Sequence, residues 1–196
     1  MPSVMAMIAP ETSDWMRQAL DARNHGRTEF ARGVFHAIRL DGGITLGASD
    51  LHAAEVARAA EAWNESIGTK VFRVVRGGDP DLQVRTVSVL EGDDQGEVDT
   101  DLELPGADHY RLTGGISICG LDHGVPLTAD EFTAVVVHEL GHVLGLDDCS
   151  NGSGAMGDYD AAHLVLRPSA DEVSLVKSIR AEMLLQILSS TSTSPK

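Results

Sequence analysis

One segment of the sequence groups residues that together could bind and use a metal ion. Residues 138–148, HELGHVLGLDD, hold two histidines four positions apart and a glutamate beside the first. Residues at i and i+4 share one face of a helix, so His138 and His142 can point at the same ion. Zinc accepts two imidazole nitrogens and a third protein ligand, with the fourth position left to water. Glu139 is placed to take the proton from that water, so the segment predicts a catalytic zinc site.

The third ligand is expected just beyond the helix that carries the two histidines. Gly145 can adopt a positive φ, end the helix and turn the chain back, so that Asp148 reaches the same metal. Asp147 is a rival ligand one residue earlier, and Cys149 is a softer one whose position fits less well. An amphipathic helix with two incidental histidines is the alternative interpretation. The HExxH pattern alone would leave this alternative open, whereas the extended pattern with Gly145 and Asp148 argues against it.

The segment resembles the long zinc signature of the metzincin metallopeptidases, HExxHxxGxx(H/D). Within it, the sequence HELGHVLGL is most similar to that of the matrixins. Metzincins also carry a Met-turn, a tight turn that places a methionine beneath the metal, and Met156 follows Asp148 at a similar spacing. Residues 167–173 resemble the entry to the family's last helix, and weaker likenesses extend the match to residues 33–188. The aspartate ligand departs from the matrixins and is similar to the snapalysin-type enzymes.

The resemblance implies an α/β (α+β) fold, with a twisted mixed β-sheet, a long active-site helix and a C-terminal helix. It divides the chain into an N-terminal segment of uncertain structure at 1–32, a catalytic domain at 33–188 and a disordered tail at 189–196. It also implies that Gly115, Ile116, Ser117 and Ile118 form the edge strand of the sheet, where an extended substrate would pair.

Local signals predict the elements that must position the site. Ser49 or Asp50 can cap a helix running to about residue 66, and residues 71–76 and 82–90 are typical of strands. Thr128 with Glu131 and Ser169 with Glu172 are capping boxes, which predict the starts of the metal-binding helix and of the C-terminal helix. Residues 34–40 are also typical of a strand, and residues 11–30 are compatible with a helix.

The acidic stretch 91–108 reads as a turn-rich loop. It is either a solvated loop, which is the favoured interpretation, or a Ca²⁺ site, although no EF-hand spacing is present. The two cysteines, Cys119 and Cys149, leave two alternatives open, a disulfide or two thiols that do not pair.

The charge of the chain limits its partners. The sequence has 30 acidic and 15 basic residues, a net charge of −15. This field disfavours nucleic acid and anionic membranes as partners, and no stretch is long and apolar enough to span a membrane. We expect a monomer that acts on peptides or proteins. The resemblance implies secretion, yet residues 1–10 lack the charged and apolar regions of a signal peptide, so a cytoplasmic location is the alternative.

Together these features predict a zinc-dependent endopeptidase, a hydrolase with one catalytic Zn²⁺, in which Glu139 is the general base. The alternative is a non-catalytic zinc-containing module that binds peptides or a partner protein. The glutamate argues against that alternative, because a structural site needs ligands but no base.

Overall fold

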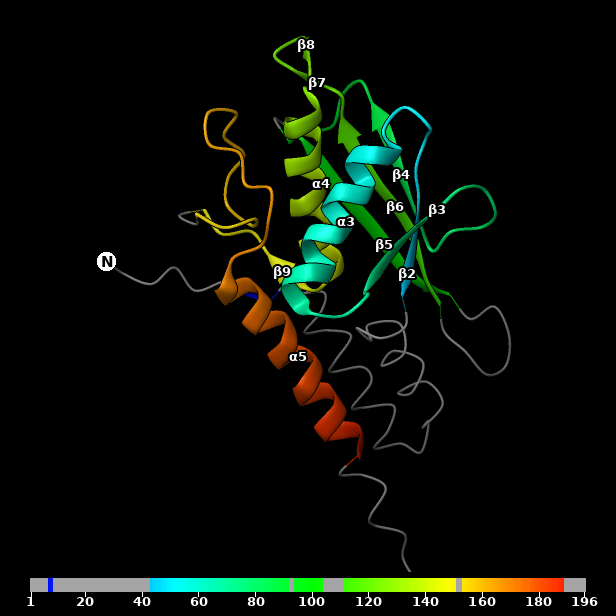
Figure 1. Ribbon diagram of the computed structural model, residues 1–196, viewed down its shortest axis with the longest axis vertical. Helices are drawn as coiled ribbons and strands as arrows, with labels where there is room; N and C mark the ends of the chain where they lie inside the picture. The colour runs from blue at the N-terminus through cyan, green and yellow to red at the C-terminus, as the bar shows by residue number, and fades with distance from the viewer. Residues whose placement is uncertain (1–6, 9–42, 92–93, 104–110, 151–152, 189–196) are drawn as a thin grey trace, which may run out of the picture.

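A computed structural model of the chain describes residues 7–8, 43–91, 94–103, 111–150 and 153–188. In this part of the chain a mixed, mostly parallel five-stranded sheet packs against helices (Figure 1). The sheet strands are β2 (Ile44–Gly47), β3 (Phe72–Val75), β4 (Leu82–Val87), β5 (Gly96–Glu103) and β6 (Arg111–Cys119). The helices are α3 (Ala53–Ile67), α4 (Ala129–Val143) and α5 (Ala170–Leu188). The short strands are β1 (Met7–Ile8), β7 (Leu121–Asp122), β8 (Val125–Pro126) and β9 (Leu146–Asp147).

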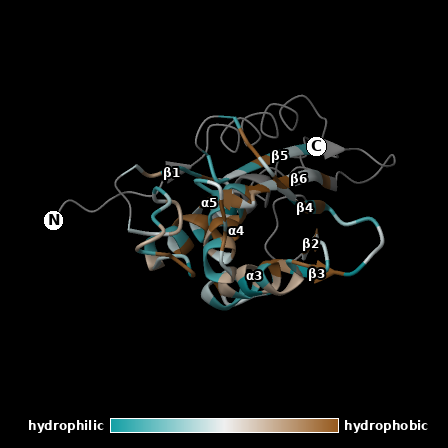
Figure 2. Cartoon of the chain, turned by 90° about the horizontal axis from the view of Figure 1, so that it is seen from above, coloured by the Kyte–Doolittle hydropathy of each residue, from teal (hydrophilic) through white to brown (hydrophobic). Residues whose placement is uncertain are grey.

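The sheet has the strand order β3-β2-β4-β6-β5. Strands β3, β2, β4 and β6 run parallel to one another, and β5 alone runs antiparallel to them, pairing with β6 from Gly96↔Ile118 to Glu103↔Arg111. Viewed from above, the helices α3 and α4 lie on the same face of the sheet (Figure 2). The mixed α/β architecture that the sequence predicts is therefore present.

The predicted edge strand is wrong. Residues 115–118 belong to β6, which pairs with β4 on one side and with β5 on the other. Both hydrogen-bonding edges of β6 are therefore used, and the side chains of Ile116 and Ile118 are fully buried in the core. The strand at that end of the sheet is β5, which forms from residues 96–103 of the stretch that was expected to be a loop.

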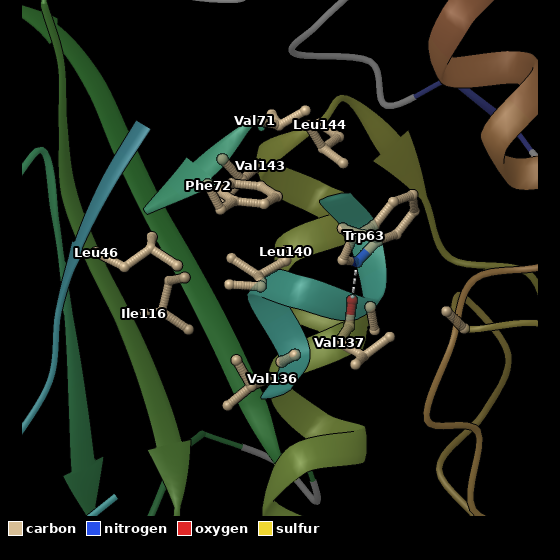
Figure 3. Close-up of a cluster of buried hydrophobic side chains, with 14 of the residues drawn as sticks. Leu46, Trp63, Val71, Phe72, Ile116, Val136, Val137, Leu140, Val143 and Leu144 are labelled. Atoms are coloured by element: carbon tan, nitrogen blue, oxygen red, sulfur yellow. Dashed lines mark hydrogen bonds between the residues drawn. The ribbon is translucent and has the colours of Figure 1, made fainter. Parts of the chain in front are cut away.

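The core lies between the sheet and the two helices that cover it. Leu46 and Ile116 point from the strands toward Leu140 on α4, and Trp63 on α3 lies farther from the strands, beside Val137 (Figure 3). The indole N–H of Trp63 donates a hydrogen bond of 2.8 Å to the carbonyl of Val137, so the largest buried ring also satisfies its polar atom. This packing fixes α4, and thus the two histidines on it, against the sheet.

Helix starts agree only in part with the sequence signals. Thr128 caps α4 through the predicted capping box, and Ser169 and Glu172 exchange the two hydrogen bonds of the second box at the start of α5. The cap predicted at Ser49 or Asp50 is wrong, because α3 begins at Ala53 after His52, whose side chain makes no capping hydrogen bond. Residues 50–52 form a turn directly before α3, in which the N–H of His52 donates to the carbonyl of Ser49.

Several predicted segments lie outside the described residues. They are the helix at 11–30, the strand at 34–40 and the tail at 189–196, together with all of the N-terminal segment except β1. Among the described helices, none is long and apolar enough to cross a membrane.

Candidate metal centre

The structure brings the three predicted ligand side chains together at the C-terminal half of α4. The Nε2 atoms of His138 and His142 lie 3.1 Å apart. Oδ1 of Asp148 lies 3.0 Å from Nε2 of His138 and 3.3 Å from Nε2 of His142. Within the described ranges this is the one group of three or more histidine, cysteine or acidic side chains that could hold a metal ion.

The spacing of the three atoms fits a small tetrahedral ion. Metal–ligand bonds of about 2.0–2.1 Å in a tetrahedron place neighbouring ligand atoms about 3.3–3.4 Å apart. The three distances, 3.0, 3.1 and 3.3 Å, are close to that value. Three electron-pair donors converging at this distance repel one another unless a proton or a cation lies between them. The group is therefore arranged as a metal ion would require, with Asp148 supplying the negative charge.

Backbone carbonyls orient both imidazoles. Nδ1 of His138 donates to the carbonyl of Ala155 at 2.8 Å, and Nδ1 of His142 donates to the carbonyl of Leu146 at 2.9 Å. A carbonyl only accepts, so each hydrogen bond places the proton on Nδ1 and leaves the lone pair on Nε2 facing the ion site. Burial lowers the pKa of His138, but the hydrogen bond and charge of Asp148 and the charge of Glu139 outweigh it and raise the pKa overall.

The third ligand arrives by a reversal of the chain after α4. Gly145 has a φ of 95°, which only glycine adopts readily, and its N–H donates to the carbonyl of His142. The next residues form β9, which pairs antiparallel with β1 through Met7↔Asp147 and Ile8↔Leu146. Asp148 then faces the histidines, and the hydrogen bond with His138 holds its pKa below the usual range. The rival Asp147 is not in the ligand group and instead accepts a hydrogen bond from the N–H of Asp148.

Glu139 lies beside the ligand group in a nearly buried position. Only 3 % of the residue is exposed, and it lines the same cleft as the three ligands. Burial raises the pKa of Glu139 to about 7, opposed by His138 and supported by the negative charges of Asp148 and Asp94. No hydrogen bond joins its carboxylate to another described residue, so the carboxylate is available to a molecule in the cleft.

Met156 packs beneath the helix that carries the histidines. It is 1 % exposed, and its sulfur sits so close to Gly141 that a Cβ at residue 141 would collide with it. Its carbonyl accepts a hydrogen bond of 2.7 Å from the N–H of Cys149, the residue that follows Asp148. Met156 thus supports the site by packing and by holding the loop of the third ligand, and it is not a member of the ligand group.

Glu172 ties this loop to the start of α5. It is 4 % exposed, and its Oε1 accepts the N–H of Met156 at 2.8 Å while its Oε2 accepts the N–H of Ser169 at 2.6 Å. The sequence identifies Glu172 only as a member of a capping box. Its second role was not predicted, because a long-range hydrogen bond to a backbone N–H leaves no local pattern. The close approach of Gly96 to Glu139 and of Gly141 to Met156 also joins distant segments and leaves no local pattern.

The ligand group opens into a cleft with a volume of about 600 Å³. One wall, here called the sheet wall, comes from residues 89–90 and 94–96, before and at the start of β5. The other, the loop wall, comes from residues 154–155, 157–160 and 163–165. The floor is the face of α4 that carries Ala134, Val135, His138 and Glu139. A cleft of this size can admit an extended segment of another molecule to the ligand group.

The structure also bears on the two cysteines and on the predicted Ca²⁺ site in the acidic stretch. In the described part of the chain Cys119 and Cys149 are thiols, the first buried and the second half-buried, and no disulfide joins them. Cys149 does not join the ligand group. The described acidic residues of 91–108 form no group that could hold Ca²⁺, and residues 92–93 and 104–108 lie outside the described ranges.

A scan against protein-family models and a search of curated proteins both found no match to the chain.

Proposed function

We propose that the chain is a zinc-dependent endopeptidase of metzincin type, with His138, His142 and Asp148 as ligands and Glu139 as general base. The observation that supports this most is the convergence of three donor atoms beside a buried glutamate in an open cleft. Two imidazoles and a carboxylate suit zinc, since softer ions favour thiolates and harder ions favour all-oxygen sites.

The ligand set has the form of a catalytic rather than a structural site. Structural zinc sites are usually closed by four protein ligands, whereas catalytic ones keep a position open. Cys149 is the nearest candidate for a fourth ligand, and it lies outside the group of the three others. The open side of the group faces the cleft, where a peptide carbonyl could approach.

In the proposed reaction, His138, His142 and Asp148 would hold the zinc, which would supply Lewis acidity toward a water molecule and the scissile carbonyl. Glu139 accepts the proton from the attacking water and passes it to the nitrogen of the leaving amine. The carbonyls of Ala155 and Leu146 keep the imidazole rings fixed while charge develops, so the ligands need not reorient. No side chain attacks the substrate, so no covalent intermediate forms.

The outer edge of β5 replaces residues 115–118 as the candidate surface for an extended substrate. Strand β5 ends the strand order of the sheet, and in the described residues no strand pairs with its outer side. Its first residue, Gly96, and the preceding Gln95 line the cleft. A peptide paired there would make backbone hydrogen bonds that tolerate many sequences.

The decisive experiment compares wild type with Glu139→Gln, which keeps the shape and removes the base. We expect the variant to keep about one zinc per chain and to lose cleavage of a mixed peptide library at least about 100-fold. Glu131→Gln is the matched control, because it removes a carboxylate from the first turn of the same helix, about 12 Å along the axis. It should cleave as wild type does.

The two other outcomes have clear meanings. Equal turnover in wild type and Glu139→Gln would show that a contaminating protease produced the signal. A wild-type protein that binds zinc but cleaves no peptide would favour the non-catalytic binding module instead.

A further inference from the structure

Among the described residues, the charged side chains that line the cleft are carboxylates, and four histidines line it as well, two of them the proposed zinc ligands. In the described part of the chain no lysine or arginine lines it. Six acidic residues do: Asp94, Asp122, Glu139, Asp148, Asp158 and Asp160. The chain as a whole carries a net charge of −15, so distant residues add to the negative potential rather than offset it.

These carboxylates occupy both walls. On the sheet wall, Asp94 is exposed and near enough to Glu139 to raise the pKa of Glu139 by its charge. On the loop wall, Asp158 and Asp160 follow directly after the segment whose Ala155 carbonyl holds His138. Asp122 comes from the β7 strand and acts electrostatically on Tyr159 of the loop wall, as Asp160 does. Negative charge therefore flanks the ligand group from more than one element.

Two of the carboxylates are available to a ligand. Asp160 already accepts hydrogen bonds from the N–H of Ala162 and from Nδ1 of His163, and Asp148 faces the histidines. By contrast, Asp94 and Asp158 are exposed, and no hydrogen bond or ion pair joins either to another described residue. Each can therefore accept a new cationic partner without losing an existing contact.

Apolar side chains accompany the two carboxylates. Val89 and Leu90 line the sheet wall near Asp94, with Val89 77 % exposed, and Leu164 and Val165 line the loop wall beyond Asp158. Lysine and arginine carry an apolar stem that packs on such surfaces and a charged tip that reaches a carboxylate. On each wall, the apolar stem of a lysine or arginine could therefore pack on apolar side chains while its charged tip reached a carboxylate.

We propose that the cleft selects cationic peptide segments, and that Asp94 and Asp158 are its specificity-determining residues. This inference rests on the proposed function, since it names the substrate class of the same site. Carboxylates in a concave, partly apolar site strengthen the negative electrostatic potential there, which raises the local concentration of a cationic ligand. An acidic segment would be repelled by the same groups.

The test uses matched fluorogenic peptides that share one sequence and differ only in carrying lysine, glutamine or glutamate on both sides of the cleaved bond. For zinc-loaded wild type we expect kcat/KM to be about tenfold higher for the lysine peptide than for the glutamine peptide, and lowest for the glutamate peptide. Raising NaCl from about 0.05 M to about 0.5 M should shrink that ratio, because salt screens exposed charges.

Asp94→Asn and Asp158→Asn should each reduce the lysine-to-glutamine ratio about two- to fivefold. Glu61→Gln is the control, because it removes one negative charge from an exposed position on α3, outside the cleft. It should keep the wild-type ratio, which separates the effect of the cleft from that of net charge.

Equal kcat/KM values for the three peptides, or wild-type ratios in both aspartate variants, would overturn the charge preference while leaving the peptidase proposal intact. If zinc-loaded protein cleaves none of the peptides, the peptidase proposal fails. Binding of the same peptides, followed by fluorescence anisotropy, then decides the charge preference. Tighter binding of the lysine peptide supports it, and equal binding of the three peptides refutes it.

Discussion

The carboxylate of Glu139 packs directly against the Cα of Gly96, and a Cβ at residue 96 would collide with it. Gly96 is the first residue of β5, whereas Glu139 lies on α4, so this contact joins the end strand of the sheet to the metal-binding helix. The absence of a side chain on the strand is what allows the glutamate to occupy its place beside the ligands.

Gly96→Ala tests this relationship. The new methyl group meets the end of a flexible side chain, so Glu139 will move rather than the backbone. We expect kcat/KM to fall about 10- to 100-fold, because a small displacement of a catalytic group is costly. Zinc content and the melting temperature should change little. Gly115→Ala on β6 is the control, because its Cβ would make only an ordinary contact of 3.5 Å. Unchanged activity in Gly96→Ala would mean that the position of Glu139 tolerates the shift.

Removing one imidazole should remove the metal. We expect purified wild type to contain about one zinc per chain, removable with phenanthroline, and His142→Ala to lose most of it because two ligands hold zinc weakly. The melting temperature of wild type should fall on chelation and recover when zinc is added back. Metal analysis and thermal unfolding measure both effects. Full zinc occupancy in His142→Ala would disprove the ligand assignment.

Glu172→Ala should destabilise the protein more than its counterpart in the other capping box. Loss of Glu172 leaves the buried N–H of Met156 without an acceptor and removes a helix cap, which together cost about 2–3 kcal/mol. Glu131→Ala removes the same kind of cap from α4 but no third hydrogen bond, so its effect should be smaller. Urea unfolding of the two zinc-loaded variants gives the comparison. Equal losses would show that the bond to Met156 adds nothing.

Met156→Leu should preserve the metal. Leucine nearly conserves the volume, so we expect a loss of about 1 kcal/mol in the free energy of unfolding and unchanged zinc stoichiometry. The measurement combines chemical denaturation with metal analysis. Loss of zinc in this variant would mean that the packing of Met156 on Gly141 decides metal binding, and not only stability.

The parts of the site that the sequence predicts well are those set by local geometry. The spacing of His138 and His142 on one helix face, the reversal at Gly145 and the two capping boxes depend on residues within a few positions of each other. The contacts of Gly96 with Glu139 and of Glu172 with Met156 join distant segments. No local pattern reports such contacts, so they could be found only from the fold.

Strand β5 was missed although its sequence contains a signal. Glu97, Asp99 and Asp101 are exposed, while Val98 and Thr100 between them are half-buried, which is the alternation of a strand with one face in solvent. The density of carboxylates favoured a loop.

The burial of Met156 has a consequence for the response of this protein to oxidants. Its sulfur is enclosed at 1 % exposure against Gly141, and conversion to the sulfoxide would add an oxygen atom where no space exists. Peroxide can therefore reach it only while the segment around residue 156 is transiently open, and the added oxygen would prevent that segment from closing again. The rate of Met156 oxidation would thus report how often this segment opens. Each oxidised molecule would lose the native packing at Met156 until a reductase converted the sulfoxide back to methionine.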